Sequence, residues 1–184
     1  MYSNKKERGA QMKDSLKNDL SDFEFHGAEQ HKQYKRTIVL SAPAGEKSVD
    51  ALITVDERDC GPTGDDDEPL VYITIKYEGK EICGHGKDYF FAKAFADLQK
   101  HLPENVKLKC CLACRYGNMC AVGNYPDEVF CTKDVEIKQI DDLYFYTEDG
   151  AERKKRSRHY TDMCDSFCDQ SRDFFTYNDY LYLL

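Results

Sequence analysis

The stretch of sequence that decides the fold is PLVYITIKYEGKEICGHGKDYFFAKAFADLQKHLP, residues 69–103. Apolar side chains occupy every second position from Val71 to Tyr77, which is the period of a β-strand with one buried face. Glu78 and Gly79 have the turn chemistry that links this strand to another short strand. The stretch therefore predicts an antiparallel hairpin followed by a helix.

The second half of this stretch has the pattern of an amphipathic helix. Apolar residues recur at i, i+4, i+7 and i+11, which places them along one face. These residues are Phe91, Phe95, Leu98 and Leu102. Asp88 is a candidate N-cap, Pro103 ends the helix, and residues 84–86 (Gly-His-Gly) are interpreted as a flexible turn before it. An apolar stripe of this kind needs a sheet to cover.

Short apolar runs on either side of this stretch complete the predicted sheet. Residues 36–42 (RTIVLSA) and 49–57 (VDALITVDE) precede it, and residues 105–111 (NVKLKCC) follow it. All three have the composition of strands. The predicted fold class is α+β, an antiparallel meander packed on one main helix in the order ββββαβ. A cysteine-rich loop and an irregular or helical C-terminal segment follow.

The chain length of 184 residues suits one domain rather than two. Residues 1–35 mix charges of both signs with few apolar positions, so they are predicted to form a mobile or loosely attached arm. Residues 36–184 are predicted to form a single α+β domain, with a metal-binding loop at 110–131. The aromatic and leucine-rich tail after Phe174 is expected to dock onto this domain, because exposing it would create a large apolar patch.

Composition limits where the protein works and what it binds. No apolar run approaches the length of a membrane span, and the first residues lack the apolar core of a secretory signal, so a soluble, cytoplasmic protein is expected. The formal net charge of −8 disfavours general affinity for nucleic acid or anionic membrane. A protein is the favoured kind of partner, with a basic protein as the candidate.

The cysteines carry the strongest chemical signal. Residues 109–131 (KCCLACRYGNMCAVGNYPDEVFC) hold five of the nine cysteines in the chain. A reducing cytosol disfavours structural disulfides, so clustered cysteines there indicate metal ligands or reactive thiols. Four of them have loop-like spacing that suits a tetrahedral metal ion: Cys111, Cys114, Cys120 and Cys131. The sequence therefore predicts a structural Zn²⁺ site, with an iron–sulfur cluster as a less favoured alternative.

The identity of the fourth ligand stays open at this point. Cys110 is adjacent to Cys111, and neighbouring strand residues face opposite sides, so Cys110 is expected to point into the core. Cys164 and Cys168 are four residues apart in a possible helix, and either can complete the site in place of Cys120. The alternative interpretation of all these residues is that they are buried free cysteines, which behave as small hydrophobic side chains.

Residues 152–158 (ERKKRSR) concentrate five basic side chains in an acidic chain. A solvated helix surface is the expected structure of this cluster. The alternative is a local docking site for an acidic partner or a nucleic-acid backbone through residues 153–158. The five histidines are scattered and match no hydrolase or metalloprotease pattern.

The segment CLACRYGNMCAVGN…VFCTKD resembles a poorly characterised family of small bacterial proteins that carry a CxxC, a Gly/Asn-rich loop and a further cysteine. The matching positions are Cys111, Cys114, Gly123 and Cys131. The helix at residues 88–103 is more loosely similar to a helix of bacterial immunity-type proteins. The resemblance implies a bacterial accessory or immunity-like protein, and it supplies no catalytic residues.

Three functions follow from these patterns. The first is a non-enzymatic accessory protein that binds another protein and is stabilised by structural zinc. The second is an enzyme that uses an activated thiol or an open metal site. The third is a local nucleic-acid binder through the basic cluster at 153–158.

Overall fold

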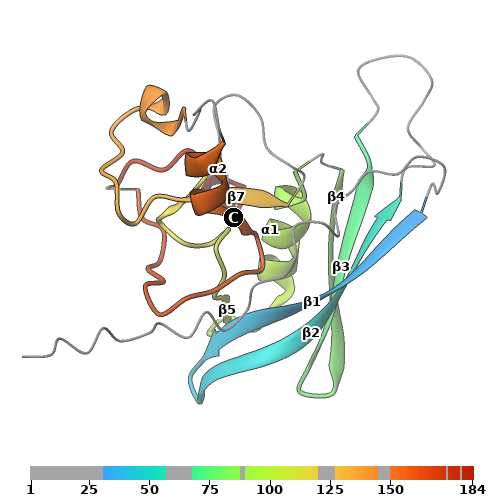
Figure 1. Cartoon of the computed structure of the whole chain (residues 1–184). Helices are drawn as coiled ribbons and strands as arrows, with labels where there is room; N and C mark the ends of the chain where they lie inside the picture. The colour runs from blue at the N-terminus through green and yellow to red at the C-terminus, as the bar shows by residue number, and fades with distance from the viewer. Residues whose placement is uncertain are drawn as a thin grey trace, which may run out of the picture.

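A computed structural model describes residues 31–56, 68–87, 90–119, 127–144, 150–172, 174–178 and 180–184. Two antiparallel sheets and a few helices make up this part of the chain (Figure 1). The expectation of an α+β chain built on an antiparallel sheet is confirmed. No helix among the described residues is long and apolar enough to cross a membrane.

The larger sheet has five strands in the order β4-β3-β2-β1-β5. Its strands are β1 (His31–Ala42), β2 (Gly45–Asp56), β3 (Leu70–Tyr77), β4 (Lys80–Lys87) and the short β5 (Lys107–Leu108). Consecutive strands from β1 to β4 pair as hairpins, and β5 pairs with β1 at Leu40 and Ser41. β1 begins at His31, so the last five residues of the predicted arm belong to the sheet. Residues 1–30 of that prediction lie outside the described residues.

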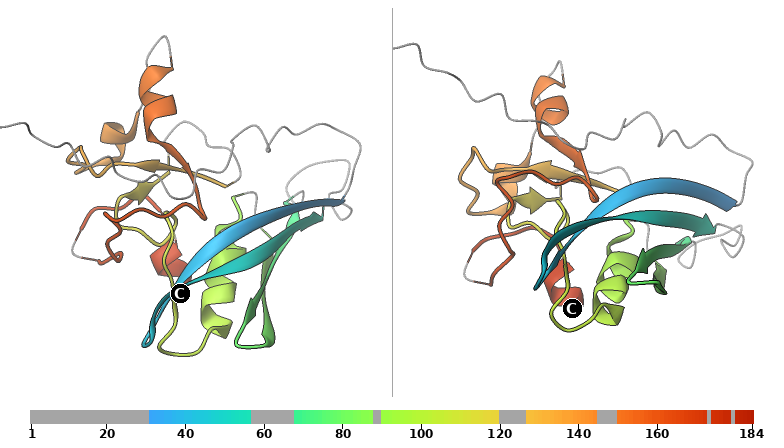
Figure 2. Two further views of the ribbon diagram at one scale, coloured as in Figure 1. Left: turned by 60° about the horizontal axis from the view of Figure 1, so that its bottom comes forward. Right: turned by 90° about the horizontal axis from the view of Figure 1, so that it is seen from below.

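Helix α1 (Ala92–His101) packs against one face of this sheet, which curls around it (Figure 2). The alternating positions on β3 are buried as the sequence predicts, with Val71, Ile73 and Ile75 at most 1% exposed. Phe95 and Leu98 of α1 are fully buried against them. The core is therefore the interface between this helix and the inner face of the sheet.

α1 lies very close to β4 because two positions on that strand lack a side chain. A Cβ atom added at Gly84 would lie 2.2 Å from the backbone nitrogen of Leu98, and one at Gly86 would lie 2.6 Å from Cβ of Lys93. The interpretation of residues 84–86 as a flexible turn is therefore wrong: they are strand residues that let the helix approach. The predicted N-cap Asp88 lies outside the described residues, and the helix starts after Phe91, whose φ is 56°.

The smaller sheet has three strands in the order β6-β7-β8. These are β6 (Gly117–Asn118), β7 (Glu128–Cys131) and β8 (Ser157–His159), and β8 directly follows α2 (Ala151–Arg156). A 3-10 helix, η2, covers Ile140–Leu143. The last element, α3 (Tyr180–Leu183), packs on α1 and buries Tyr180 to 4% exposure. The C-terminal tail thus docks onto the body, as expected.

Candidate metal centre

The CxxC segment is folded by a series of tight turns after β5. The backbone N–H of Ala113 donates to the carbonyl of Cys110 at 3.1 Å, and that of Cys114 donates to the carbonyl of Cys111 at 3.3 Å. The N–H of Gly117 then donates to the carbonyl of Cys114 at 2.9 Å. A Cβ atom at position 117 would lie 1.9 Å from the carbonyl oxygen of Cys111, so this compact loop requires glycine there.

Four thiols from separate parts of the chain line one small pocket. Cys111 and Cys114 come from the CxxC turns, Cys131 from the end of β7, and Cys164 from the C-terminal segment. The volume of the pocket is about 20 Å³, which is room for one small ion or water molecule. Its remaining walls are Tyr116, Gly117, Val129, Lys133 and Ser166. Three segments that are separate in the sequence therefore meet at this pocket.

Backbone hydrogen bonds bring Cys164 to the pocket. The N–H of Cys111 donates to the carbonyl of Asp162 at 2.6 Å, and the N–H of Arg115 donates to the carbonyl of Cys168 at 2.8 Å. Cys114 also forms an isolated antiparallel bridge with Asp169. These bonds hold residues 162–169 alongside the CxxC turns, with Cys164 within the bonded stretch.

The structure separates the predicted ligands into three groups. Cys111, Cys114 and Cys131 are brought together, whereas Cys120 lies outside the described residues. Cys110 is fully buried in the hydrophobic core, as expected, although residues 110 and 111 lie in a bend and a turn after β5 rather than in a strand. Cys168 does not line the pocket, and its Sγ accepts a hydrogen bond from Nη1 of Arg115 at 3.8 Å. Cys164 is thus the thiol that joins the three.

Burial keeps the two cysteines of the CxxC protonated in the absence of a cation. It raises the pKa of the Cys111 thiol well above its ordinary value, and the nearby Asp162 carboxylate raises that pKa further. Burial also raises the pKa of Cys114, against backbone hydrogen bonds that lower it. Among the described residues, no group of three or more His, Cys, Asp or Glu side chains is already set to hold a metal ion. Metal binding at this pocket therefore requires loss of protons and rotation of the thiols.

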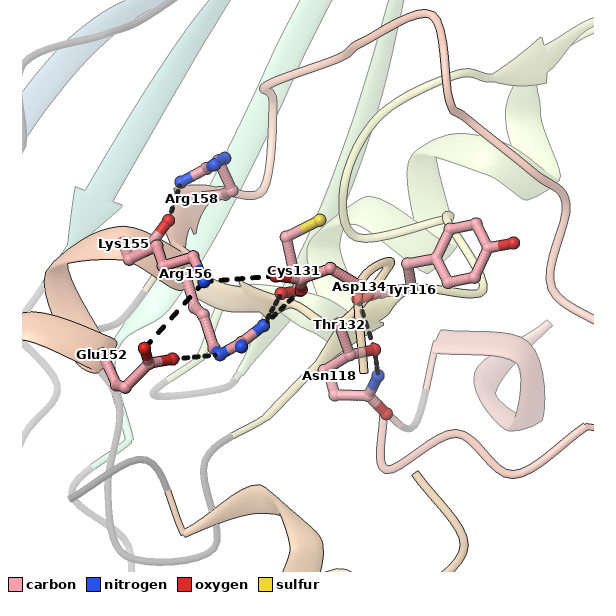
Figure 3. A network of polar contacts seen from close by, with 9 residues as sticks. All are labelled: Tyr116, Asn118, Cys131, Thr132, Asp134, Glu152, Lys155, Arg156 and Arg158. Atoms are coloured by element: carbon pink, nitrogen blue, oxygen red, sulfur yellow. Dashed lines mark hydrogen bonds and ion pairs between the residues drawn. The ribbon is translucent and has the colours of Figure 1, made fainter. Parts of the chain in front are cut away.

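Arg156 supports the strand end that carries Cys131 (Figure 3). Its Nη1 donates to the carbonyl of Cys131 at 3.2 Å and to Oδ1 of Asp134 at 2.6 Å. Its Nε donates to Oε2 of Glu152 at 2.9 Å. The expectation that residues 152–158 form a solvated surface is wrong for Arg156, which is only 6% exposed. Its guanidinium is buried because it binds the backbone carbonyl of Cys131.

Two other members of the basic cluster also pair within the chain. Nη2 of Arg153 lies 2.6 Å from Oε2 of the buried Glu128, and Nζ of Lys155 lies 3.3 Å from Oδ2 of Asp134. Most of the cluster's charge is therefore balanced by acids of the same region. This pairing reduces the positive field that a nucleic-acid backbone needs.

Side-chain amides from the C-terminal segment bind the carbonyls of the CxxC turns. Nδ2 of Asn178 donates to the carbonyls of Leu112 at 2.8 Å and Gly117 at 2.9 Å. Nε2 of Gln170 also donates to the carbonyl of Leu112, at 2.9 Å. Sequence reasoning missed both residues, because a single Asn or Gln in a tail carries no motif and its partners are backbone atoms.

A buried histidine–carboxylate pair lies in the smaller sheet, outside the cysteine pocket: His159 is on β8 and Asp127 immediately precedes β7. Nδ1 of His159 is 2.6 Å from Oδ2 of Asp127, and the two side chains are 1% and 2% exposed. The backbone N–H of His159 donates to Oδ2 of Asp162 at 2.9 Å. Solvent and substrates do not reach a pair this deeply buried, so its geometry indicates a structural role.

No protein-family model, curated protein or solved structure matches this chain. The resemblance of the cysteine segment to small bacterial proteins therefore stays a hypothesis.

Proposed function

We propose that this chain is a non-enzymatic protein-binding module whose C-terminal half is held together by one structural zinc ion. Its ligands are Cys111, Cys114, Cys131 and Cys164. The observation that carries the proposal is the convergence of four thiols from three separate segments on one pocket with room for a single ion. The smaller sheet is short, and the segments around it contain few regular elements, which is the situation that structural zinc stabilises in other small folds.

The chemistry of the pocket favours zinc over the alternatives. Four thiolates match the tetrahedral preference of Zn²⁺, with Zn–S bonds of about 2.3 Å. Iron–sulfur clusters are usually held by more closely spaced cysteines than Cys114, Cys131 and Cys164. Lys133 in the pocket wall supplies positive charge beside a site that would carry two net negative charges. Among the described residues no group of three or more thiols is already set for a metal ion, so the cysteine side chains must rotate to aim their sulfurs at one ion.

Two features favour a structural site over a catalytic one. Four protein ligands close the coordination shell and leave no position for a substrate or an activated water. The raised pKa values of Cys111 and Cys114 oppose thiolate nucleophiles, which need a lowered pKa. Binding of another protein, in the manner of a bacterial accessory or immunity-like protein, is the function that remains.

The identity of the fourth ligand provides the test. The chain is purified under reducing conditions, and its zinc content is measured by elemental analysis together with native mass. We expect one zinc per chain in the wild type, with affinity weakened at least about tenfold in Cys164→Ser. Cys168→Ser is the matched control, four residues away, and it should bind zinc like the wild type.

Two results would overturn the proposal. Wild-type protein with no bound metal would remove the zinc site altogether. Zinc that is lost in Cys120→Ser but kept in Cys164→Ser would show that the ligand set is wrong. The three remaining ligands can be checked in the same way, since Cys111→Ser, Cys114→Ser and Cys131→Ser should each behave like Cys164→Ser.

A further inference from the structure

The two hairpins of the larger sheet separate before they reach their turns. β1 and β2 pair continuously to Ala42↔Gly45, and β3 and β4 pair to Tyr77↔Lys80. The pairing of β2 with β3 stops earlier, at Ala51↔Ile75. Figures 1 and 2 show the hairpin ends diverging beyond this point. Residues 45–50 of β2 therefore have β1 on one side and no described strand on the other.

This open edge of β2 is accessible. Every residue from Gly45 to Asp50 is exposed except Val49, which points into the core. Nζ of Lys47 lies 5.0 Å from the ring centroid of Tyr77, so this side chain reaches from β2 to β3. This contact lies on the core side, and the β2·β3 ladder does not extend to the backbone of residues 45–50. Unpaired strand backbone of this kind is a template for another strand.

A hollow of about 510 Å³ lies at the point where the hairpins separate. Five charged residues line it: Arg36 is buried, and the other four are exposed, one on each of four strands, namely Lys35, Asp50, Lys76 and Glu81. None of these four forms an ion pair or side-chain hydrogen bond with any residue that the structure describes. Lys76 and Glu81 are even direct cross-strand partners, where opposite charges ordinarily attract. The hollow therefore presents two cations and two anions that are available to a partner.

The far edge of the sheet shows the contrasting, protected arrangement. The N–H of His85 on β4 donates to Oδ2 of Asp97 at 2.9 Å, and the carbonyl of Lys87 accepts from Nζ of Lys93 at 2.9 Å. Side chains of α1 thus occupy backbone groups along the β4 edge. No such cover is present over residues 45–50 in the described part of the chain.

We propose that an extended segment of a partner protein binds at this gap by adding a strand to β2 at residues 45–50. This inference rests on the proposal that the chain binds a protein. Backbone hydrogen bonds to β2 would supply affinity, and the charges of the hollow would select the segment. Side chains on one face of a strand are two residues apart. The segment that fits carries, on one face, a basic residue to meet Asp50 and an acidic residue to meet Lys76.

The test uses the full chain and a defined probe, the capped heptapeptide Thr-Lys-Val-Glu-Val-Lys-Thr. Amide chemical shifts are followed by NMR during titration at low ionic strength. We expect the shifts to change at residues 45–50 and at Lys76 and Glu81. Asp50→Lys should weaken binding by roughly tenfold or more, because it places like charges together. Glu104→Lys makes the same charge change at an exposed site after α1 and should bind like the wild type.

Backbone methylation of the peptide separates strand addition from simple charge attraction. In one control peptide the two valine nitrogens are methylated, and in a second the two lysine nitrogens and the glutamate nitrogen are methylated. A strand pairs through one edge only, so one control should lose roughly tenfold or more in affinity and the other should keep most of it.

Three results would overturn this inference: no shift changes at millimolar peptide, shift changes at another surface, or equal binding by all three peptides. The zinc content of each sample is measured in parallel. If the chain binds the peptide but contains no metal, only the zinc site is overturned. If the chain contains zinc but does not bind the peptide, only the strand addition is overturned.

Discussion

At the scale of single residues, the pair of His159 and Asp127 makes the fold sensitive to pH. Burial by itself lowers the pKa of His159, but the hydrogen bond and the charge of Asp127 outweigh this effect and raise it above the ordinary value. Burial raises the pKa of Asp127, against the hydrogen bond and charge of His159, which lower it. Both shifts mean that the folded chain holds protons more tightly than the unfolded chain.

The sign of the pH dependence follows from these two shifts. A group with a raised pKa in the folded state contributes stability below its unfolded pKa, and this contribution is lost as the pH rises through the folded pKa. For His159 the loss begins at about pH 6.5. We expect the free energy of unfolding to fall above this pH, by about 1.4 kcal/mol for each unit by which the folded pKa exceeds the unfolded one.

Urea unfolding between pH 6 and pH 8.5, at constant ionic strength, measures this fall. His159→Gln removes the titrating group, and Asp127→Asn removes the cause of the raised pKa, so both variants should show a smaller slope than the wild type. Parallel slopes in all three proteins would contradict the assignment, whatever the absolute stabilities of the variants.

At the scale of secondary-structure elements, the contact between β4 and α1 depends on Gly84. A Cβ atom there would meet the helix backbone at the carbonyl of Ala94, 2.5 Å away, and at Leu98. Backbone atoms cannot rotate away, so Gly84→Ala must push α1 off the sheet. We expect a loss of about 3 kcal/mol in the free energy of unfolding. Cys83→Ala, at the exposed neighbouring position, should change stability by less than about 0.5 kcal/mol in the same chemical denaturation.

Elements with a clear hydrophobic period were predictable from the sequence, and those positioned by tertiary contacts were not. The alternation from Val71 to Tyr77 and the stripe at Phe95 and Leu98 agree with the buried faces of β3 and α1. The Gly-His-Gly sequence at residues 84–86 favours a flexible turn, yet α1 packs so closely on β4 that Gly84 must lack a side chain. Local propensity gives no information about a neighbour that packs from elsewhere in the chain.

In the candidate metal centre, too, local spacing was predictable from the sequence and tertiary contacts were not. The spacing of Cys111 and Cys114 predicted two ligands on one turn, and the structure brings Cys131 beside them. Cys164 was one of several open choices, because its position depends on the backbone bond between Cys111 and Asp162. The sequence predicts a surface position for Arg156, because clusters of charged residues usually lie on the surface. Its partner is the backbone carbonyl of Cys131, and a backbone partner cannot be recognised from the sequence.

At the scale of the whole molecule, the proposed zinc ion links two parts of the chain that differ in how many other contacts stabilise them. The larger sheet is held by long ladders between β1, β2, β3 and β4 and by the core under α1. The C-terminal segment is attached to the CxxC turns mainly by scattered backbone bonds and by the amides of Gln170 and Asn178. Loss of the ion should therefore release the C-terminal segment before the sheet unfolds.

Hydrogen exchange with and without a strong zinc chelator measures this order of release. The amides of Cys111, Leu112 and Arg115 donate to carbonyls of residues 160–168, so they should lose protection when the metal is removed. The amides of β2 and β3 within their shared ladder should keep theirs, because no ligand lies on those strands. Cys164→Ser without chelator should reproduce the chelated pattern. Simultaneous loss of protection in the ladder and in the CxxC turns would show that the ion supports the entire fold, and unchanged protection everywhere would show that it supports neither.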